Sequence, residues 1–283
     1  MTRILAILLL PAGIALIAGA GAIAAGRAAR SPAGPSRPGH AHHLASASGR
    51  YHPALDGPAR LLLLLLGGAV IIYGVMVGLG ILVIHAGPVI DKPIFHWTVT
   101  HRVHSWYDLM GRATEVGDKY PTWAAAATAA VCLAVAWRRD KWLPPVILGA
   151  LIVVDHFLTI AINHTEHRTP PPGAGGIFPS GGSERAILFY GLIAYLLWRE
   201  FSGTRQGAIW AGTVAAALGF HEGYTRAYLA VHWFTDVLSG WFYGCLMLAL
   251  FIAAVRLTLG PARAPAPAVT GRHATMPVRG AAG

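Results

Sequence analysis

The chain has 283 residues, of which 55% are hydrophobic and only 12% are charged, a composition typical of a membrane protein with several transmembrane helices. A formal net charge of +10 would suggest a nucleic-acid partner for a soluble protein. Here the Lys and Arg residues fall mainly in alternate loops, so membrane orientation explains the charge and no nucleic-acid partner is expected. Cys132 and Cys245 lie inside apolar runs without metal-ligand spacing, which argues against a disulfide framework or a zinc site.

The N-terminal part of the chain contains an apolar segment followed by a linker. Residues 1–26 have the length of a transmembrane helix, although their Ala- and Gly-rich end also resembles a signal-peptide cleavage site. Residues 27–60 are rich in Pro, Gly, Ala, Ser and His, which predicts a flexible cytoplasmic linker. The cluster of His40, His42 and His43 lacks partner ligands at a fixed spacing, so we expect no metal and no cofactor.

Six further apolar runs predict one membrane domain, residues 61–257. The runs cover residues 61–86, 121–137, 143–163, 184–200, 206–220 and 233–257. Residues 88–120 mix aromatic residues and histidines with charges, which predicts an interfacial amphipathic segment rather than a site. Residues 258–283 are predicted to form a disordered cytoplasmic tail.

The distribution of positive charge predicts the orientation of these helices. If residue 60 is cytoplasmic, the inner segments carry twice as many Lys and Arg residues as the outer ones, as the positive-inside rule requires. Residues 164–184 and 221–232 then lie together on the extracytoplasmic face. Cleavage after residues 1–26 would reverse this bias, so a retained N-terminal helix is favoured. We therefore predict an all-α, multi-pass protein of the cell membrane, with a six-helix core and one additional N-terminal helix.

The segment from Gly219 to Gly240 carries the first candidate functional residues. His232 and Asp236 are four residues apart and share one face if the run that begins near Val231 is helical. A carboxylate at that position fixes the imidazole tautomer and leaves the other ring nitrogen free for nucleophilic attack. The planar guanidinium of Arg226 suits bidentate recognition of phosphate. Taken alone, the three residues fit equally well a helix cap and an arginine that reaches the lipid headgroups.

A second segment, residues 163–185, also has the features of an anion site. Its Pro-Ser-Gly-Gly turn at residues 179–182 stands directly before an apolar run, where backbone N–H groups and the helix dipole favour an anion. Arg168 adds a positive charge upstream. A serine N-cap at Ser180 or Ser183 would explain the turn residues but not the arginine.

The two segments together resemble the type 2 phosphatidic acid phosphatase superfamily, which is related to the vanadium haloperoxidases. The motifs are Arg168 in a Pro-rich loop, Pro-Ser-Gly at residues 179–181, and Thr225-Arg226 followed by His232 and Asp236, within residues 61–257. The resemblance implies a membrane hydrolase for a lipid phosphate or isoprenoid diphosphate whose tail lies in the bilayer. It assigns His232 as the nucleophile of a phosphohistidine intermediate and Asp236 as the carboxylate that orients it. The phosphate-binding positions it implies are Arg226, Arg168, Ser180, Gly181 and Gly182.

The sequence departs from the family pattern at two places. Gly182 stands where the family has a histidine that protonates the leaving group, and residues 161–163 (Ala-Ile-Asn) stand where the first motif begins with a lysine. Replacement general acids close in sequence are His164, His167 and Glu184, together with Glu166 and His221, and a phosphate leaving group would need little protonation.

Alternative functions follow from these departures. A phosphotransferase of the same fold and a non-catalytic relative that binds lipid phosphates both fit the motifs. A transporter would need charged residues near mid-span, where only Asp155 and His156 lie, and we interpret these as a buried polar pair. The sequence identifies neither the lipid nor the oligomeric state.

Overall fold

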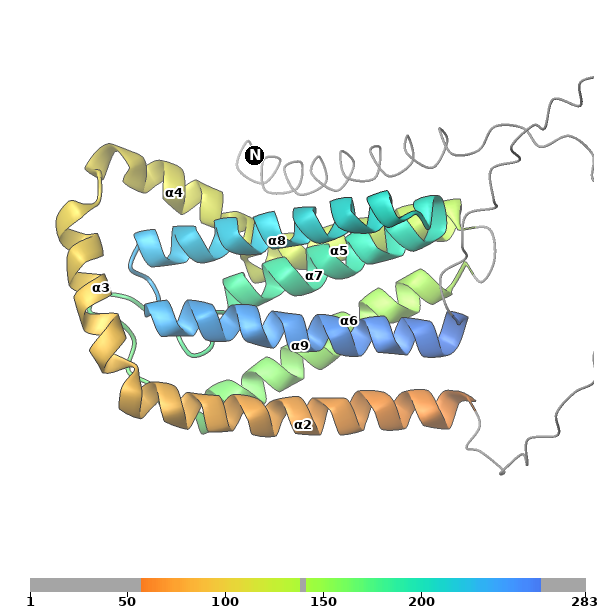
Figure 1. The fold of residues 1–283 in the computed structure, drawn as a ribbon, viewed down its shortest axis with the longest axis horizontal. Helices are drawn as coiled ribbons and strands as arrows, with labels where there is room; N and C mark the ends of the chain where they lie inside the picture. Colours follow the sequence, from red (N-terminus) through yellow and green to blue (C-terminus); the bar gives the residue numbers. More distant parts are fainter. Residues whose placement is uncertain (1–56, 138–140, 261–283) are drawn as a thin grey trace, which may run out of the picture.

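The computed structural model describes residues 57–137 and 141–260, and all the regular secondary structure in these ranges is helical. Figure 1 shows a bundle whose long helices run side by side. These helices are α2 (Gly57–Ala86), α5 (Lys119–Ala136), α6 (Leu143–Thr165), α7 (Gly181–Leu197), α8 (Arg205–Tyr228) and α9 (Phe234–Leu259). The predicted all-α, polytopic class with a six-helix core is therefore confirmed. The predicted N-terminal helix and most of the predicted linker and tail lie outside the described residues, and residues 57–60 of the linker belong to α2.

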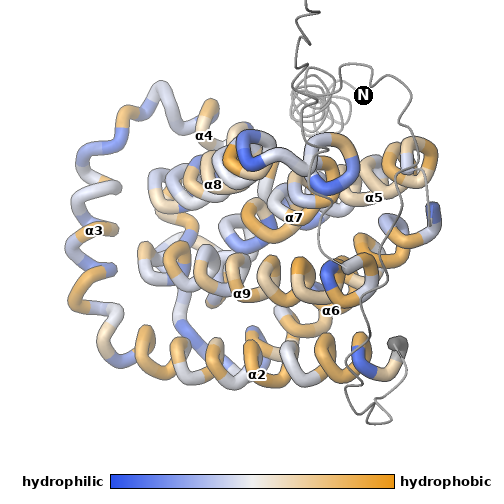
Figure 2. Tube along the Cα trace, turned by 45° about the vertical axis from the view of Figure 1, so that its right-hand side comes forward, coloured by the Kyte–Doolittle hydropathy of each residue, from blue (hydrophilic) through white to orange (hydrophobic). Residues whose placement is uncertain are grey.

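Three of the described helices are long and apolar enough to cross a membrane. They are Ala59–Ala86 of α2, Leu143–Thr165 (α6) and Phe234–Leu259 (α9). The hydrophobic colouring runs along the length of α2 and α9 in Figure 2. Many large apolar side chains of α2, among them Leu62, Leu66 and Val70, are exposed, as expected for a surface that contacts lipid.

Helix α7 occupies the centre of the bundle. It contacts α5, α6, α8 and α9, and its side chains from Leu188 to Leu196 are all buried. Such burial on every face identifies a core helix, in contrast to the amphipathic helix of a soluble surface. Helix α7 begins after the turn that ends at Ser180, so the packed core fixes the position of that turn.

One end of the bundle collects the segments that carry the motifs. The C-terminal ends of α6 and α8 and the N-terminal ends of α7 and α9 all lie at the left in Figure 1. The helix α3 (Pro88–His101) crosses this end, followed by a 3-10 turn (His104–Trp106), α4 (Tyr107–Ala113) and a second 3-10 turn, η2 (Thr114–Gly117). The two motif segments therefore lie at the same end of the bundle.

Several local predictions need correction. Helix α8 continues to Tyr228, so the predicted connection 221–232 is mostly helical. Helix α9 begins at Phe234, so His232 precedes the helix and does not share a helical face with Asp236. Asp155 is buried, but the His156 ring packs against Trp123 and Phe157, and the two residues do not form a buried polar pair.

Residues 88–120 differ most from the prediction. Instead of only lying at the interface, α3 packs against α8 and α9, and η2 packs against α7 and α8. Asp91 on α3 and Thr114 on η2 are both buried and turn toward the bundle. This segment therefore supplies side chains to the candidate site.

Candidate active site

The loop between α6 and α7 meets the start of α9 at two points. The backbone N–H of Ser180 donates to the backbone oxygen of Asp236 at 3.0 Å. A Cβ atom added to Gly176 would lie 2.1 Å from the backbone oxygen of Val231 and 2.8 Å from Nδ1 of His232, so only glycine lets the loop pass this close to residues 231 and 232. The expected convergence of the two motif segments is therefore present in the fold.

His232 is buried at this junction, with 9% of its surface exposed. Its Nδ1 lies 3.9 Å from Oδ2 of Asp236, which is an ion-pair distance but longer than a hydrogen bond. The same Oδ2 accepts the backbone N–H of Trp233 at 3.1 Å, so Asp236 also caps α9. The carboxylate and imidazole are thus adjacent, and an approach of about 1 Å would join them by a hydrogen bond.

A small cavity reaches His232 from the side of α3. It lies between α3 and the corner that joins α8 to α9, and apart from His232 and Thr98 its side chains are apolar or aromatic. The lining residues are Ile94, Phe95, Thr98, Ala227, Ala230, His232, Trp233 and Phe234.

Arg168 joins the loop to α3 and α9. Its guanidinium forms ion pairs with Asp91 and Asp236, and its Nη1 donates to Oγ1 of Thr235 at 2.9 Å. The side chains of Arg168, Asp91 and Asp236 are 7%, 1% and 1% exposed, respectively. Asp91 also accepts the backbone N–H and the hydroxyl of Thr235. In the free protein, Arg168 therefore serves as the bridge between two buried carboxylates.

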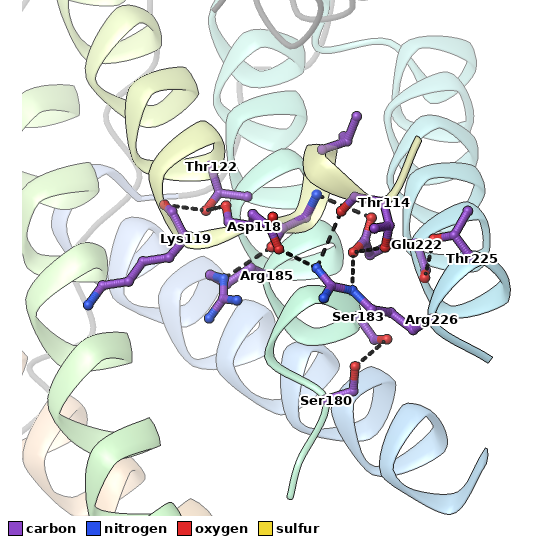
Figure 3. A network of polar contacts seen from close by, with 12 residues as sticks. Thr114, Asp118, Lys119, Thr122, Ser180, Ser183, Arg185, Glu222, Thr225 and Arg226 are labelled. Atoms are coloured by element: carbon purple, nitrogen blue, oxygen red, sulfur yellow. Dashed lines mark hydrogen bonds and ion pairs between the residues drawn. The ribbon is translucent and has the colours of Figure 1, made fainter. Parts of the chain in front are cut away.

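Arg226 lies in a second polar network, drawn in Figure 3. Its Nε donates to Oε1 of Glu222 at 2.7 Å, and its Nη2 donates to the backbone oxygen of Thr114 at 3.3 Å and to a carboxylate oxygen of Asp118. Glu222 is fully buried and also accepts the Thr114 hydroxyl and the backbone N–H of Gly117. The guanidinium is thus held from three sides by α8 and η2.

The N-terminus of α7 lies against this network. A Cβ atom at Gly182 would lie 2.5 Å from Oε1 of Glu222 and 2.7 Å from both Nε and Nη2 of Arg226. A Cβ atom at Gly181 would lie 2.8 Å from Nη1 of Arg185, whose Nε donates to the backbone oxygen of Gly117. Backbone amides in a first helical turn have no acceptor in their own helix. We call this region, residues 181–183 with Arg185 and Arg226, the anion site.

The remaining predicted positions are placed as follows. The hydroxyl of Ser180 is 2.9 Å from that of Ser183. Among the predicted replacement acids, His164 and His167 are exposed, whereas Glu184 is fully buried inside the bundle beside Asp155. His221 contacts the backbone oxygen of Ala113. Their role as proton donors stays a prediction.

Glu166 closes the C-terminal end of α6. Its carboxyl packs at the place where a Cβ on Gly80 of α2 would stand. Burial raises the pKa of this carboxyl above its ordinary value of 4.5, and the neighbouring His167 lowers it by less. Glu166 therefore retains its proton to a higher pH than an exposed glutamate.

Five residues of the site escaped the sequence analysis, and they are Asp91, Thr114, Asp118, Arg185 and Glu222. Glu222 precedes Arg226 by four residues on one helix, a spacing that favours an ion pair and was a readable signal. Asp91, Thr114 and Asp118 come from the segment between α2 and α5, and only the fold places them near the motifs. Arg185 lies three residues after the turn at residues 179–182, so its position in the sequence was also a readable signal.

Comparison with known protein families finds a match in the part of the chain that carries the motifs. Residues 153–258 match the model of the PAP2 superfamily. This region contains all three motifs described above, but it does not contain the site residues that precede α6. This match agrees with the resemblance that the motifs indicated.

One known protein is similar to the chain in sequence, and one solved structure is similar to it in fold. The chain is 36% identical over 73 residues to phosphatidylglycerophosphatase B of Bacillus subtilis (strain 168), a match that covers 26% of this chain and 36% of that protein. The chain thus spans about a third of the length of this relative. The fold resembles the crystal structure of a transmembrane PAP2-type phosphatidylglycerolphosphate phosphatase from Bacillus subtilis, with a TM-score of 0.54 and 23% identity. That match covers 70% of this chain and 96% of the other.

Proposed function

We propose that the protein is a membrane phosphatase that removes phosphate from a lipid phosphate or an isoprenoid diphosphate at the extracytoplasmic face. The observation that carries the proposal is the meeting of His232 and Asp236 with the loop that leads into the anion site. A buried imidazole beside a carboxylate is the arrangement that a histidine nucleophile needs. Arg226, Arg185 and the first amides of α7 supply the positive potential that a transferring phosphoryl group needs.

The reaction would proceed in two steps. Nδ1 of His232 faces Asp236, so Nε2 is the nitrogen that attacks phosphorus, and the bond between phosphorus and the leaving oxygen breaks. A water molecule then attacks the phosphohistidine, and the phosphorus–nitrogen bond breaks to release phosphate. Asp236 would stabilise the imidazole while it carries the phosphoryl group. If an alcohol replaced water in the second step, the same site would act as a phosphotransferase.

The apolar cavity beside α3 supports a lipid substrate. Its aromatic and aliphatic lining reaches His232 directly, so an apolar tail and a phosphate head could approach the same residue from different sides. The name of the Bacillus subtilis relative, phosphatidylglycerophosphatase B, also supports a phospholipid phosphate as the substrate class.

A non-catalytic role as a lipid-phosphate binder is favoured by a separate observation. Arg168 and Arg226 are both fully engaged with carboxylates, and Gly182 offers no proton donor. In this role the protein would bind a lipid phosphate at the anion site without hydrolysing it.

The test is phosphate release from a panel of lipid phosphates and diphosphates by the purified protein in detergent micelles. We expect release by the wild type and loss of at least about a thousandfold in His232→Ala, since the nucleophile is removed. His96→Ala is the matched control, because it removes an exposed imidazole of α3 that has no assigned role in the site. Orthovanadate binding without turnover by the wild type would favour the non-catalytic role. Equal activity of wild type and His232→Ala would refute the proposed mechanism.

A further inference from the structure

Arg226 has two carboxylate partners, and their environments differ sharply. The side chain of Glu222 is 0% exposed, and its two oxygens accept hydrogen bonds from Arg226, Thr114 and Gly117. The side chain of Asp118 is 46% exposed. Arg226 is expected to stay bound to Glu222, because separation would leave a buried carboxylate without its charged partner. Asp118 can leave Arg226 and turn into water at little cost in free energy.

Asp118 is also diverted from the role that its position would normally give it. It is the N-cap residue of α5, where an aspartate usually accepts a hydrogen bond from the first turn of its own helix. Its side chain makes no such bond and instead reaches Nη2 of Arg226. The contact is therefore not a by-product of helix capping.

The Arg226 atom that Asp118 binds is near the first turn of α7. Nη2 of Arg226 lies 2.7 Å from the place of a Cβ at Gly182, in the first turn of α7. Figure 3 shows Asp118 between Arg226 and Arg185, next to this turn. Carboxylate and phosphate oxygens bind a guanidinium through the same hydrogen bonds. An anion that binds Nη2 in this geometry must take the place of the Asp118 carboxylate.

We propose that Asp118 is an internal occupant of the anion site, which the substrate phosphate displaces when it binds. The proposal rests on the phosphate-binding role of Arg226 in the proposed function. Asp118 then determines specificity, because a monoanion with one charge competes poorly with a tethered carboxylate, whereas a phosphate dianion with three acceptor oxygens competes well. Glu222 stays in place during this exchange and keeps Arg226 directed toward α7.

The experiment compares orthovanadate binding, measured by isothermal titration, for the wild type and Asp118→Asn in detergent micelles. Asparagine caps helices about as well as aspartate, so α5 is expected to retain its N-cap preference. We expect the vanadate Kd to fall about two- to fivefold, the range that a partly exposed ion pair contributes, and KM for the lipid phosphate to fall in parallel. Asp108→Asn is the matched control: it removes one exposed carboxylate from α4 and is expected to leave Kd unchanged.

The two carboxylates are expected to act in opposite directions. Glu222→Gln is expected to raise the Kd for vanadate, because it loosens the contact that holds Arg226 in place. A lower Kd in Asp118→Asn and a higher Kd in Glu222→Gln would distinguish a carboxylate that competes with the anion from one that positions Arg226. An unchanged or raised Kd in Asp118→Asn, or an equal fall in Asp108→Asn, would overturn the role of Asp118 while leaving the proposed function intact. If the wild type neither binds vanadate nor releases phosphate through His232, the proposed function fails, and this inference with it.

Discussion

Replacement of Gly182 by alanine tests the packing between α7 and the network of Arg226. The added methyl group would lie 2.5 Å from Oε1 of Glu222 and 2.7 Å from Nε and Nη2 of Arg226, well inside an ordinary contact of about 3.5 Å. Both groups would have to move by nearly 1 Å, and the hydrogen bond of 2.7 Å between them would be disturbed. Glycine at this position is therefore a requirement of the buried network.

The magnitude follows from two opposing effects. Overpacking of a well-packed site costs about 1–3 kcal/mol, and replacement of a helical glycine by alanine returns at most about 1 kcal/mol. We therefore expect Gly182→Ala to lower the free energy of unfolding by about 1–2 kcal/mol. The family histidine at this position would meet the same obstacle, so Gly182→His is also expected to be destabilising and not to raise activity.

The assay is denaturant unfolding of the detergent-solubilised protein, followed by circular dichroism. Gly149→Ala in α6 is the matched control, because a Cβ there has no neighbour within 4 Å and its stability is expected to be unchanged or slightly higher. In a Glu222→Ala background the added cost of Gly182→Ala is expected to shrink, since the nearest obstacle is gone. Equal stability of Gly182→Ala and the Gly149→Ala control would refute the reasoning.

Two other predictions concern the loop between α6 and α7. Gly176→Ala places a methyl group 2.1 Å from the backbone oxygen of Val231 and 2.8 Å from Nδ1 of His232. Because the clash displaces His232, phosphate release is expected to fall at least about tenfold. Gly175→Ala, with no neighbour within 4 Å, is the control, and equal activities of the two variants would contradict the reasoning. Because the folded state raises the pKa of Glu166 above 4.5, it binds this proton more tightly than the unfolded state. The contribution of this group to the free energy of unfolding is complete below pH 4.5 and is lost as the pH rises through the raised pKa. The free energy of unfolding, measured across this pH range, is therefore expected to decline in the wild type but not in Glu166→Gln.

The sequence predicted the helices well because apolar length is a strong signal. The runs predicted at 143–163 and 233–257 became α6 and α9 with ends displaced by only one or two residues. The prediction failed at the end of α8, where polar residues after Phe220 suggested a loop. Those residues continue the helix because their polar groups, such as Glu222 and Thr225, are satisfied by partners on η2.

The candidate site was predictable only where its residues are close in sequence. His232, Asp236 and Arg226 fall within eleven residues, and together with the turn at residues 179–182 they indicated phosphate chemistry. Asp91 lies 77 residues before its partner Arg168, and Asp118 lies 108 residues before its partner Arg226. Their segment has the composition of an interfacial helix, and only the packing of α3 and η2 onto the bundle brings them to Arg168 and Arg226.

The bridge formed by Arg168 limits how this protein can evolve. A change at Asp91, Arg168 or Asp236 alone would leave a buried charge without its partner. Such a change is expected to lower the free energy of unfolding by about 3–5 kcal/mol. Homologous sequences are therefore expected to keep all three residues or to exchange them as a set. Sequence change in the segment before α5 is therefore coupled to conservation at the junction between the α6–α7 loop and α9, even though the two belong to distant parts of the gene.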